Sequence, residues 1–140
     1  MQGTTSPTLS YADLRQTMVD CQIRTFDVTD YRLIGRLLEV PREKFLSPDL
    51  SPLAYSDSAL TIHSEKTGET RSLLPPFVLA RMIQGAEVTP QDKVLDIASA
   101  TGYSTALLAG LAGEVVALES DAGFCAEIAT NLKALGLDKA

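Results

Sequence analysis

The sequence predicts an α/β fold with a parallel sheet at its core. Two runs of Val, Leu, Ile and Ala, at residues 93–98 and 114–119, have the composition of buried strands. Each run is followed by a segment with the apolar spacing of a helix, at residues 103–112 and 122–135. Strands that alternate with helices are typical of a parallel sheet covered by helices on both faces.

Two further helices are expected before this unit. The first begins after Ser10, a residue type that caps helix N-termini, and extends to about Arg24. The second begins near Asp30 and ends before Pro41, because proline disfavours helix in the residue that precedes it. Its apolar residues share one face: Leu33, Ile34, Leu37 and Leu38.

The segment at residues 41–74 is rich in Pro, Ser, Asp and Gly, which predicts loops with brief strands, or a hairpin around Thr67 and Gly68. A third helix is expected to start at residues 75–76 and to end at Gly85, because proline favours the first helical position and glycine the C-terminal cap.

Composition limits the class of protein. A chain of 140 residues, 45% of them hydrophobic, is expected to form one domain with one core. A net charge of −6 with 12 unclustered basic residues argues against a nucleic-acid partner, and the apolar runs are too short to span a membrane. The N-terminus lacks a signal-peptide pattern, and Cys21 and Cys125 are expected to be buried, reduced thiols, which favours the cytoplasm. His63, the lone histidine, is expected in a loop, so no metal site or catalytic triad is predicted.

The loop between the two predicted strands suggests a nucleotide cofactor. Its small residues alternate at Ala98, Ala100 and Gly102, and small side chains allow a ligand to approach the backbone closely. Glu119 ends the second strand, 17 residues after Gly102, where an acidic residue accepts hydrogen bonds from ribose hydroxyls in nucleotide-binding folds. Because the loop lacks the G-x-G-x-x-G pattern of pyrophosphate binding, it fits an adenosine–methionine ligand better than NAD.

These residues also carry a family resemblance. The stretch VLDIASATGYSTALLA resembles the first motif of class I methyltransferases, and MVDCQIRTFDVTD, LLEVPREKF and LAYSD resemble the opening of the protein-L-isoaspartate O-methyltransferases. The resemblance implies a Rossmann-like class I methyltransferase fold, cut after the second strand and its helix. It also implies an enzyme that uses S-adenosylmethionine to methylate the α-carboxylate of isoaspartyl residues, a protein-repair reaction.

The resemblance divides the chain and assigns roles. Residues 1–9 are expected to be a disordered lead, residues 10–74 the N-terminal helices and loop-rich segment, and residues 75–140 the first half of the cofactor-binding domain. Asp96 would orient the loop near the methionine part, and Glu119 would hold the ribose. The rest of the cofactor set is Ala98, Ser99, Ala100, Thr101, Gly102, Tyr103 and Ser104.

The chain departs from the family pattern in two places. Ala98 and Ala100 replace glycine; a positive φ there would cost roughly 1–3 kcal/mol, whereas close approach alone would tolerate a methyl group. In the segment GETRSLLPP, one alignment places Thr70 and Ser72 on the family's substrate-contacting hydroxyls, and another places Leu74 on the serine position. Ser72 is otherwise a solvated hairpin residue, and the neighbouring arginine is a candidate partner for an acidic substrate.

Two other functions remain open. One is a non-catalytic homologue that binds the cofactor or a protein partner, and the other is a methyltransferase with a different acceptor. The unpaired far edge of a two-stranded sheet also predicts that the chain is part of a longer protein or that it associates through that edge.

Overall fold

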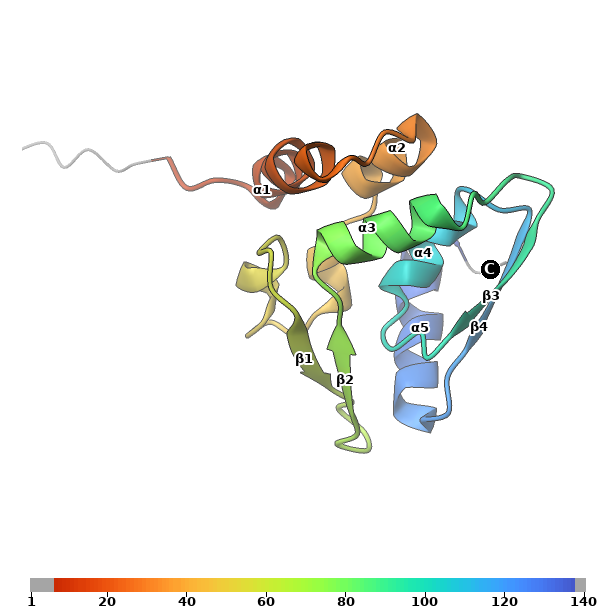
Figure 1. Ribbon diagram of the computed structural model, residues 1–140. Helices are drawn as coiled ribbons and strands as arrows, with labels where there is room; N and C mark the ends of the chain where they lie inside the picture. The colour runs from red at the N-terminus through yellow and green to blue at the C-terminus, as the bar shows by residue number, and fades with distance from the viewer. Residues whose placement is uncertain (1–6, 138–140) are drawn as a thin grey trace, which may run out of the picture.

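The computed structural model describes residues 7–137, and Figure 1 shows how the elements are arranged. Most of the expected disordered lead therefore lies outside the described residues. The chain forms an N-terminal helical part, a hairpin and a βαβα unit. Its α-helices are α1 (Tyr11–Met18), α2 (Tyr31–Glu39), α3 (Pro76–Gly85), α4 (Tyr103–Ala109) and α5 (Ala122–Ala134), and its strands are β1 (Leu60–His63), β2 (Thr70–Leu73), β3 (Lys93–Ile97) and β4 (Glu114–Leu118).

The first predicted helix is three consecutive pieces. Helix α1 is capped by Ser10, whose Oγ accepts a hydrogen bond from the N–H of Asp13 at 3.1 Å. A π-helix (Val19–Ile23) and a 3₁₀ turn (Arg24–Phe26) follow it. Because the π-helix brings both of its end residues into the core, Cys21 lies off the buried stripe and is exposed. Its predicted burial is wrong.

The loop-rich segment contains two short 3₁₀ turns (Arg42–Phe45 and Ser51–Leu53) and the hairpin. Strands β1 and β2 pair antiparallel, with Leu60 opposite Leu73. Gly68 turns the chain between them with φ +73°, a conformation that favours glycine. His63 is the exposed last residue of β1, so the expectation that it lies in a loop is wrong.

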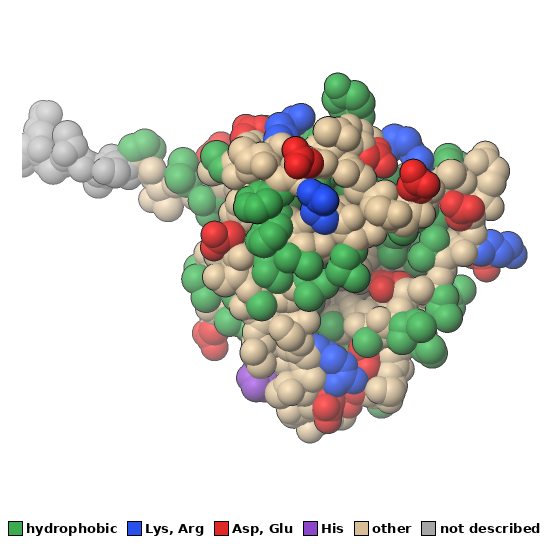
Figure 2. Space-filling model, in the orientation of Figure 1, with side chains coloured by type: hydrophobic (Ala, Val, Ile, Leu, Met, Phe, Trp, Pro, Cys, Tyr) green, Lys and Arg blue, Asp and Glu red, His purple; other side chains and the backbone are tan. Residues whose placement is uncertain are grey.

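Strands β3 and β4 pair in parallel, as expected, with Asp96 opposite Ala117. One face of this sheet is buried under α4 and α5, which share a core with Val115. The other face is exposed in the described part of the chain, and Figure 2 shows hydrophobic side chains over this region. Its exposed fractions are Leu95 55%, Ile97 67%, Val116 50% and Leu118 52%. The expectation of helices on both faces is wrong here, because α4 and α5 lie on the same side.

One hydrophobic core joins the N-terminal helices to the βαβα unit. Ile23, Leu33 and Leu37 from the helical part pack with Leu107 of α4 and Val115 of β4. A smaller cluster holds the hairpin against the start of α5: Leu60, Ile62, Leu73, Ala100 and Phe124. Helices α4 and α5 therefore lie between the hairpin and the sheet, as Figure 1 shows.

Candidate functional site

The loop after β3 has an alternating backbone conformation. Ala98, Ala100 and Gly102 have φ values of 59°, 53° and 95°, all in the left-handed region, whereas the residues between them do not. Both alanines therefore adopt the conformation in which alanine is strained, by roughly 1–3 kcal/mol each. Of the two alternatives left open by the sequence, positive φ is the one that the structure shows.

Backbone and side-chain hydrogen bonds hold this loop in place. The N–H of Ala98 donates to the carbonyl of Leu118 at 2.7 Å, which continues the pairing between β3 and β4. The hydroxyl of Ser99 donates to the carbonyl of Asp96 at 2.7 Å, and the N–H of Gly102 donates to the carbonyl of Ser99 at 2.8 Å. Gly102 is the N-cap residue of α4.

A cavity of about 220 Å³ lies between this loop and the end of the hairpin. Typical ligand pockets measure roughly 300–1,000 Å³, so this cavity holds only part of a cofactor-sized ligand. Seven of the residues predicted for the site line it: Ser72, Asp96, Ala98, Ser99, Ala100, Tyr103 and Ser104.

Asp96 is the acidic residue of the cavity. It is half-buried, and its Oδ2 accepts hydrogen bonds from the hydroxyls of Ser104 and Thr105, both at 2.7 Å. Thr105 is fully buried and was not among the predicted site residues. The sequence signal that could have identified it is a hydroxyl-bearing residue in the first turn of α4, the helix that follows the loop. These two bonds fix the orientation of the carboxylate at the mouth of the loop.

Glu119 lies at the end of β4, with 1% of its side chain exposed. Its carboxylate accepts hydrogen bonds from the N–H groups of Ala100, at 3.1 Å, and Asp121, at 3.2 Å. The guanidinium of Arg71 forms an ion pair with it, at 2.6 Å from Nη2 to Oε1. Burial alone would raise the pKa of Glu119, but these donors together lower the pKa below its ordinary value.

The two alignments of the hairpin segment involve Thr70, Ser72 and Leu74, and these residues differ in their position relative to the cavity. Ser72 in β2 and Leu74 directly after the strand both line the cavity, as does Leu73 between them. Thr70 is further along β2, opposite His63, and is exposed outside the cavity. Arg71, between Thr70 and Ser72, points toward Glu119 and not toward an open acceptor site.

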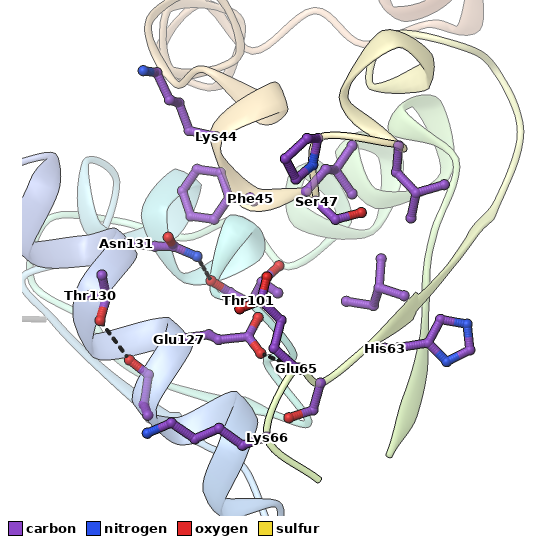
Figure 3. A pocket seen from close by; sticks show the side chains of 16 residues that line it. Lys44, Phe45, Ser47, His63, Glu65, Lys66, Thr101, Glu127, Thr130 and Asn131 are labelled. Atoms are coloured by element: carbon purple, nitrogen blue, oxygen red, sulfur yellow. Dashed lines mark hydrogen bonds between the residues drawn. The ribbon is translucent and has the colours of Figure 1, made fainter. Parts of the chain in front are cut away.

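Thr101 lies on the other side of the loop. It lines a second cavity of about 530 Å³ between β1, the turn Arg42–Phe45 and α5, shown in Figure 3. Its carbonyl accepts a hydrogen bond from Asn131 at 3.0 Å. Thr101, Gly102, Thr70 and Glu119 are thus the predicted site residues that do not line the 220 Å³ cavity.

Arg42 also lines the 220 Å³ cavity and was missed by the sequence reasoning. It is 1% exposed, and it donates to the carbonyls of Ala54, at 2.8 Å, and Leu74, at 3.0 Å. Its guanidinium lies 4.8 Å from the centre of the Tyr103 ring. No local pattern marks a single arginine in a loop as buried, so the sequence offered no signal for it.

The fold and this loop define the class: a Rossmann-like α/β unit with a loop of small residues after its first strand and an acidic residue after its second. A family model described as Protein-L-isoaspartate(D-aspartate) O-methyltransferase (PCMT) matches residues 14–140. The chain belongs to this family, and it spans about half the length of the curated relatives it matches.

Individual relatives agree with this assignment. The protein-L-isoaspartate O-methyltransferase of Protochlamydia amoebophila is 42% identical over 73% of this chain and 46% of that protein. The Koribacter versatilis protein of the same name is 37% identical over 94% of this chain and 57% of that protein.

Solved structures show the same fold. A protein-L-isoaspartate O-methyltransferase superposes with a TM-score of 0.74 at 26% identity, over 93% of this chain and 40% of the other. A Plasmodium falciparum protein described as a beta-aspartate methyltransferase, in complex with S-adenosyl-L-homocysteine, superposes with a TM-score of 0.68 at 17% identity. That match covers 94% of this chain and 61% of the other.

Proposed function

We propose that this chain forms the cofactor-binding part of an S-adenosylmethionine-dependent O-methyltransferase that acts on isoaspartyl residues of proteins. The observation that carries the proposal is the loop after β3, with left-handed backbone at Ala98, Ala100 and Gly102, joined by a hydrogen bond to Glu119 at the end of β4. The family's name supports the acceptor, and the complex of the Plasmodium falciparum protein with S-adenosyl-L-homocysteine supports the cofactor.

The residues of the cavity suit this cofactor. Its sulfonium centre is a cation and supplies the methyl group, and the half-buried carboxylate of Asp96 provides a complementary charge. The methyl side chains of Ala98 and Ala100 leave room beside the loop. We assign the cofactor to Asp96, Glu119 and the loop residues 98–104.

Ser72 and Thr70 are the proposed contacts to the acceptor. An isoaspartyl α-carboxylate is ionised near neutral pH, so the protein needs to position and desolvate it and not to remove a proton. The position of Ser72 beside the loop supports a hydrogen bond from its hydroxyl to that carboxylate. Thr70 rests on the alignment alone.

Calorimetric titration with S-adenosylhomocysteine tests the cofactor site without an assumption about the acceptor. We expect saturable binding with about 1:1 stoichiometry, abolished in Glu119→Ala, whose circular dichroism spectrum verifies folding. A folded wild-type chain that binds no S-adenosylhomocysteine would contradict the proposal.

A non-catalytic homologue is the second candidate. The strained alanines and the ion pair that already occupies Glu119 favour it. Methyl transfer to an isoaspartyl peptide separates the two: turnover supports the enzyme, and cofactor binding without turnover supports the homologue or a methyltransferase with another acceptor. Ser72→Ala and Thr70→Ala should each lower turnover, whereas Thr17→Ala, at an exposed hydroxyl of α1, serves as the control.

We further propose that the chain works in the cytoplasm and self-associates through the sheet β3–β4. Two free thiols, Cys21 and Cys125, support a reducing compartment. The exposed apolar face of the sheet supports association. Within residues 7–137, no helix is long and apolar enough to span a membrane.

A further inference from the structure

The carboxylate of Glu119 is already saturated with hydrogen-bond donors. Oε1 accepts from Arg71 Nη2 at 2.6 Å and from the N–H of Asp121 at 3.2 Å. Oε2 accepts from the N–H of Ala100 at 3.1 Å and from Arg71 Nε at 3.4 Å. A carboxylate offers about four lone-pair sites. A ribose diol therefore cannot add two hydrogen bonds unless a present donor leaves.

Two of these donors are fixed by the backbone. The N–H of Ala100 belongs to the hydrogen-bonded loop, and Asp121 caps α5 by accepting from the N–H of Phe124 at 2.9 Å. Neither can leave without rearranging the loop or the start of the helix.

The remaining donors, the Ser120 hydroxyl at 3.5 Å from Oε1 and the guanidinium of Arg71, can leave, and of these two only Arg71 contacts both carboxylate oxygens. Its side chain is 20% exposed and lies at the surface of β2 over the ring of Phe124. Its Nη1 already contacts Glu69 Oε1 at 3.2 Å, and the side chain of Glu69 is 57% exposed. A guanidinium displaced from Glu119 would keep this second partner and gain hydration.

We propose that Arg71 is a specificity-determining residue that competes with the ligand for Glu119, so that a ligand must present a vicinal diol to displace it. This inference rests on the proposed function, because it takes a ribose as the occupant of the site. A diol replaces both hydrogen bonds of the guanidinium fork, one to each carboxylate oxygen. A 2′-deoxyribose replaces only one and leaves the buried carboxylate under-satisfied.

The competition also links the ligand to the hairpin. Arg71 lies on β2, and its ion pair joins the hairpin to the end of β4. Displacement removes this link, while the apolar cluster around Phe124 and Leu73 remains. Ligand binding should therefore change the environment of the Arg71 side chain directly and leave the packing of the hairpin unchanged.

Calorimetry with S-adenosylhomocysteine on the 140-residue chain tests the proposal. Arg71→Met removes the competitor and keeps an apolar side chain of similar length, so we expect binding tighter by roughly tenfold. Arg71→Lys, which keeps the charge but loses the fork, should fall between Arg71→Met and wild type. Arg24→Met removes the same charge from an exposed pair with Asp20 and should bind as wild type does.

A second measurement uses the wild-type chain, so its result does not depend on the stability of the variants. In the ¹⁵N-labelled wild-type chain, the Arg71 Nε–H resonance, assigned by its absence in Arg71→Met, should shift toward the position of a solvated arginine on saturation with S-adenosylhomocysteine. The 2′-deoxy analogue should bind more weakly and shift it less.

The outcomes separate this inference from the function on which it rests. Equal or weaker binding by a folded Arg71→Met chain, or an unmoved Arg71 resonance at saturation, would overturn the competition while leaving the cofactor site intact. Absence of binding by wild type and Arg71→Met alike would overturn the proposed function and this inference with it.

Discussion

At the scale of single residues, the loop after β3 stores backbone strain that hydrogen bonds sustain. Ala98 and Ala100 adopt φ values that glycine adopts without cost. The N–H of each is used, by the carbonyl of Leu118 and by the carboxylate of Glu119. The strained conformation is therefore determined by the neighbouring strand, and the two alanines tolerate it.

Replacing Ala98 with glycine should relieve this strain. Ala98 is exposed, so the methyl group removed contributes little packing, and we expect the free energy of unfolding to rise by about 1 kcal/mol. Ala100 is 4% exposed, and the loss of a buried methyl, about 0.8 kcal/mol, should largely cancel the gain in Ala100→Gly.

Urea unfolding measures these free energies. The control is Ala129→Gly in the middle of α5, an exposed helical position where glycine should lower stability by up to about 1 kcal/mol. A loss of stability in Ala98→Gly equal to that of the control would show that the loop is unstrained.

Glu119 should contribute a pH-dependent part of the stability. Its pKa is lowered in the folded chain, so its contribution is complete above the ordinary glutamate pKa of about 4.3. It is lost as the pH falls further, through the lowered folded value, because the native state must then give up its Arg71 ion pair.

Thermal unfolding between neutral and acidic pH compares wild type with Glu119→Gln. We expect the difference in Tm to favour wild type at neutral pH and to shrink below about pH 4.3. Glu39→Gln, at an exposed position on α2, controls for the loss of one negative charge. A Tm difference that does not change with pH would contradict the ion pair.

At the scale of elements, Arg42 joins three parts of the chain. From the turn Arg42–Phe45 its guanidinium reaches the carbonyl of Ala54, the carbonyl of Leu74 after β2, and the ring of Tyr103 at the start of α4. Burial lowers the pKa of Arg42, although Tyr103 partly offsets this effect. The hairpin and the loop-to-helix junction are thus held by one side chain.

Arg42→Met should therefore destabilise the chain. It leaves the buried carbonyl of Ala54 and the partly buried carbonyl of Leu74 without their donor, and we expect a loss of roughly 2–4 kcal/mol in the free energy of unfolding. Lys44→Met, at an exposed position of the same turn, should leave this free energy nearly unchanged. Urea unfolding measures both, and equal effects would show that burial of Arg42 contributes no stability.

At the scale of the whole molecule, the sheet β3–β4 presents an apolar face. Alternate side chains of both strands are half or more exposed, whereas the residues between them face α4 and α5. Large exposed apolar patches mark contacts with another surface. The 140-residue chain in isolation is therefore expected to associate.

Light scattering after size exclusion tests this expectation. Wild type should show a concentration-dependent mass above 15.0 kDa, and the double variant Ile97→Lys/Val116→Lys should lower it. Tyr31→Lys, at an apolar position of α2 that is 84% exposed, is the control and should behave as wild type. A monomeric wild type at all concentrations would remove this part of the proposal.

The elements could be predicted because their signals are local. Ser10 caps α1 as expected, α2 begins after Asp30 as expected, and the parallel pairing of β3 with β4 is confirmed. The positions of Cys21 and Cys125 could not be predicted, because exposure depends on which helical face meets the core. Cys125 lies at the surface, with its Sγ donating to the carbonyl of Glu119 at 3.1 Å.

The sequence by itself determined the order of the elements, the family, and the small-residue loop followed by an acidic residue, because each depends on residues close together in the chain. Only the tertiary structure decided that Ala98 and Ala100 have positive φ, since the adjacent β4 imposes it through Leu118 and Glu119. It also decided that the guanidinium of Arg71 binds the carboxylate of Glu119, although the two residues are 48 positions apart in the sequence. Such contacts arise when distant segments pack, and no spacing along the chain encodes them.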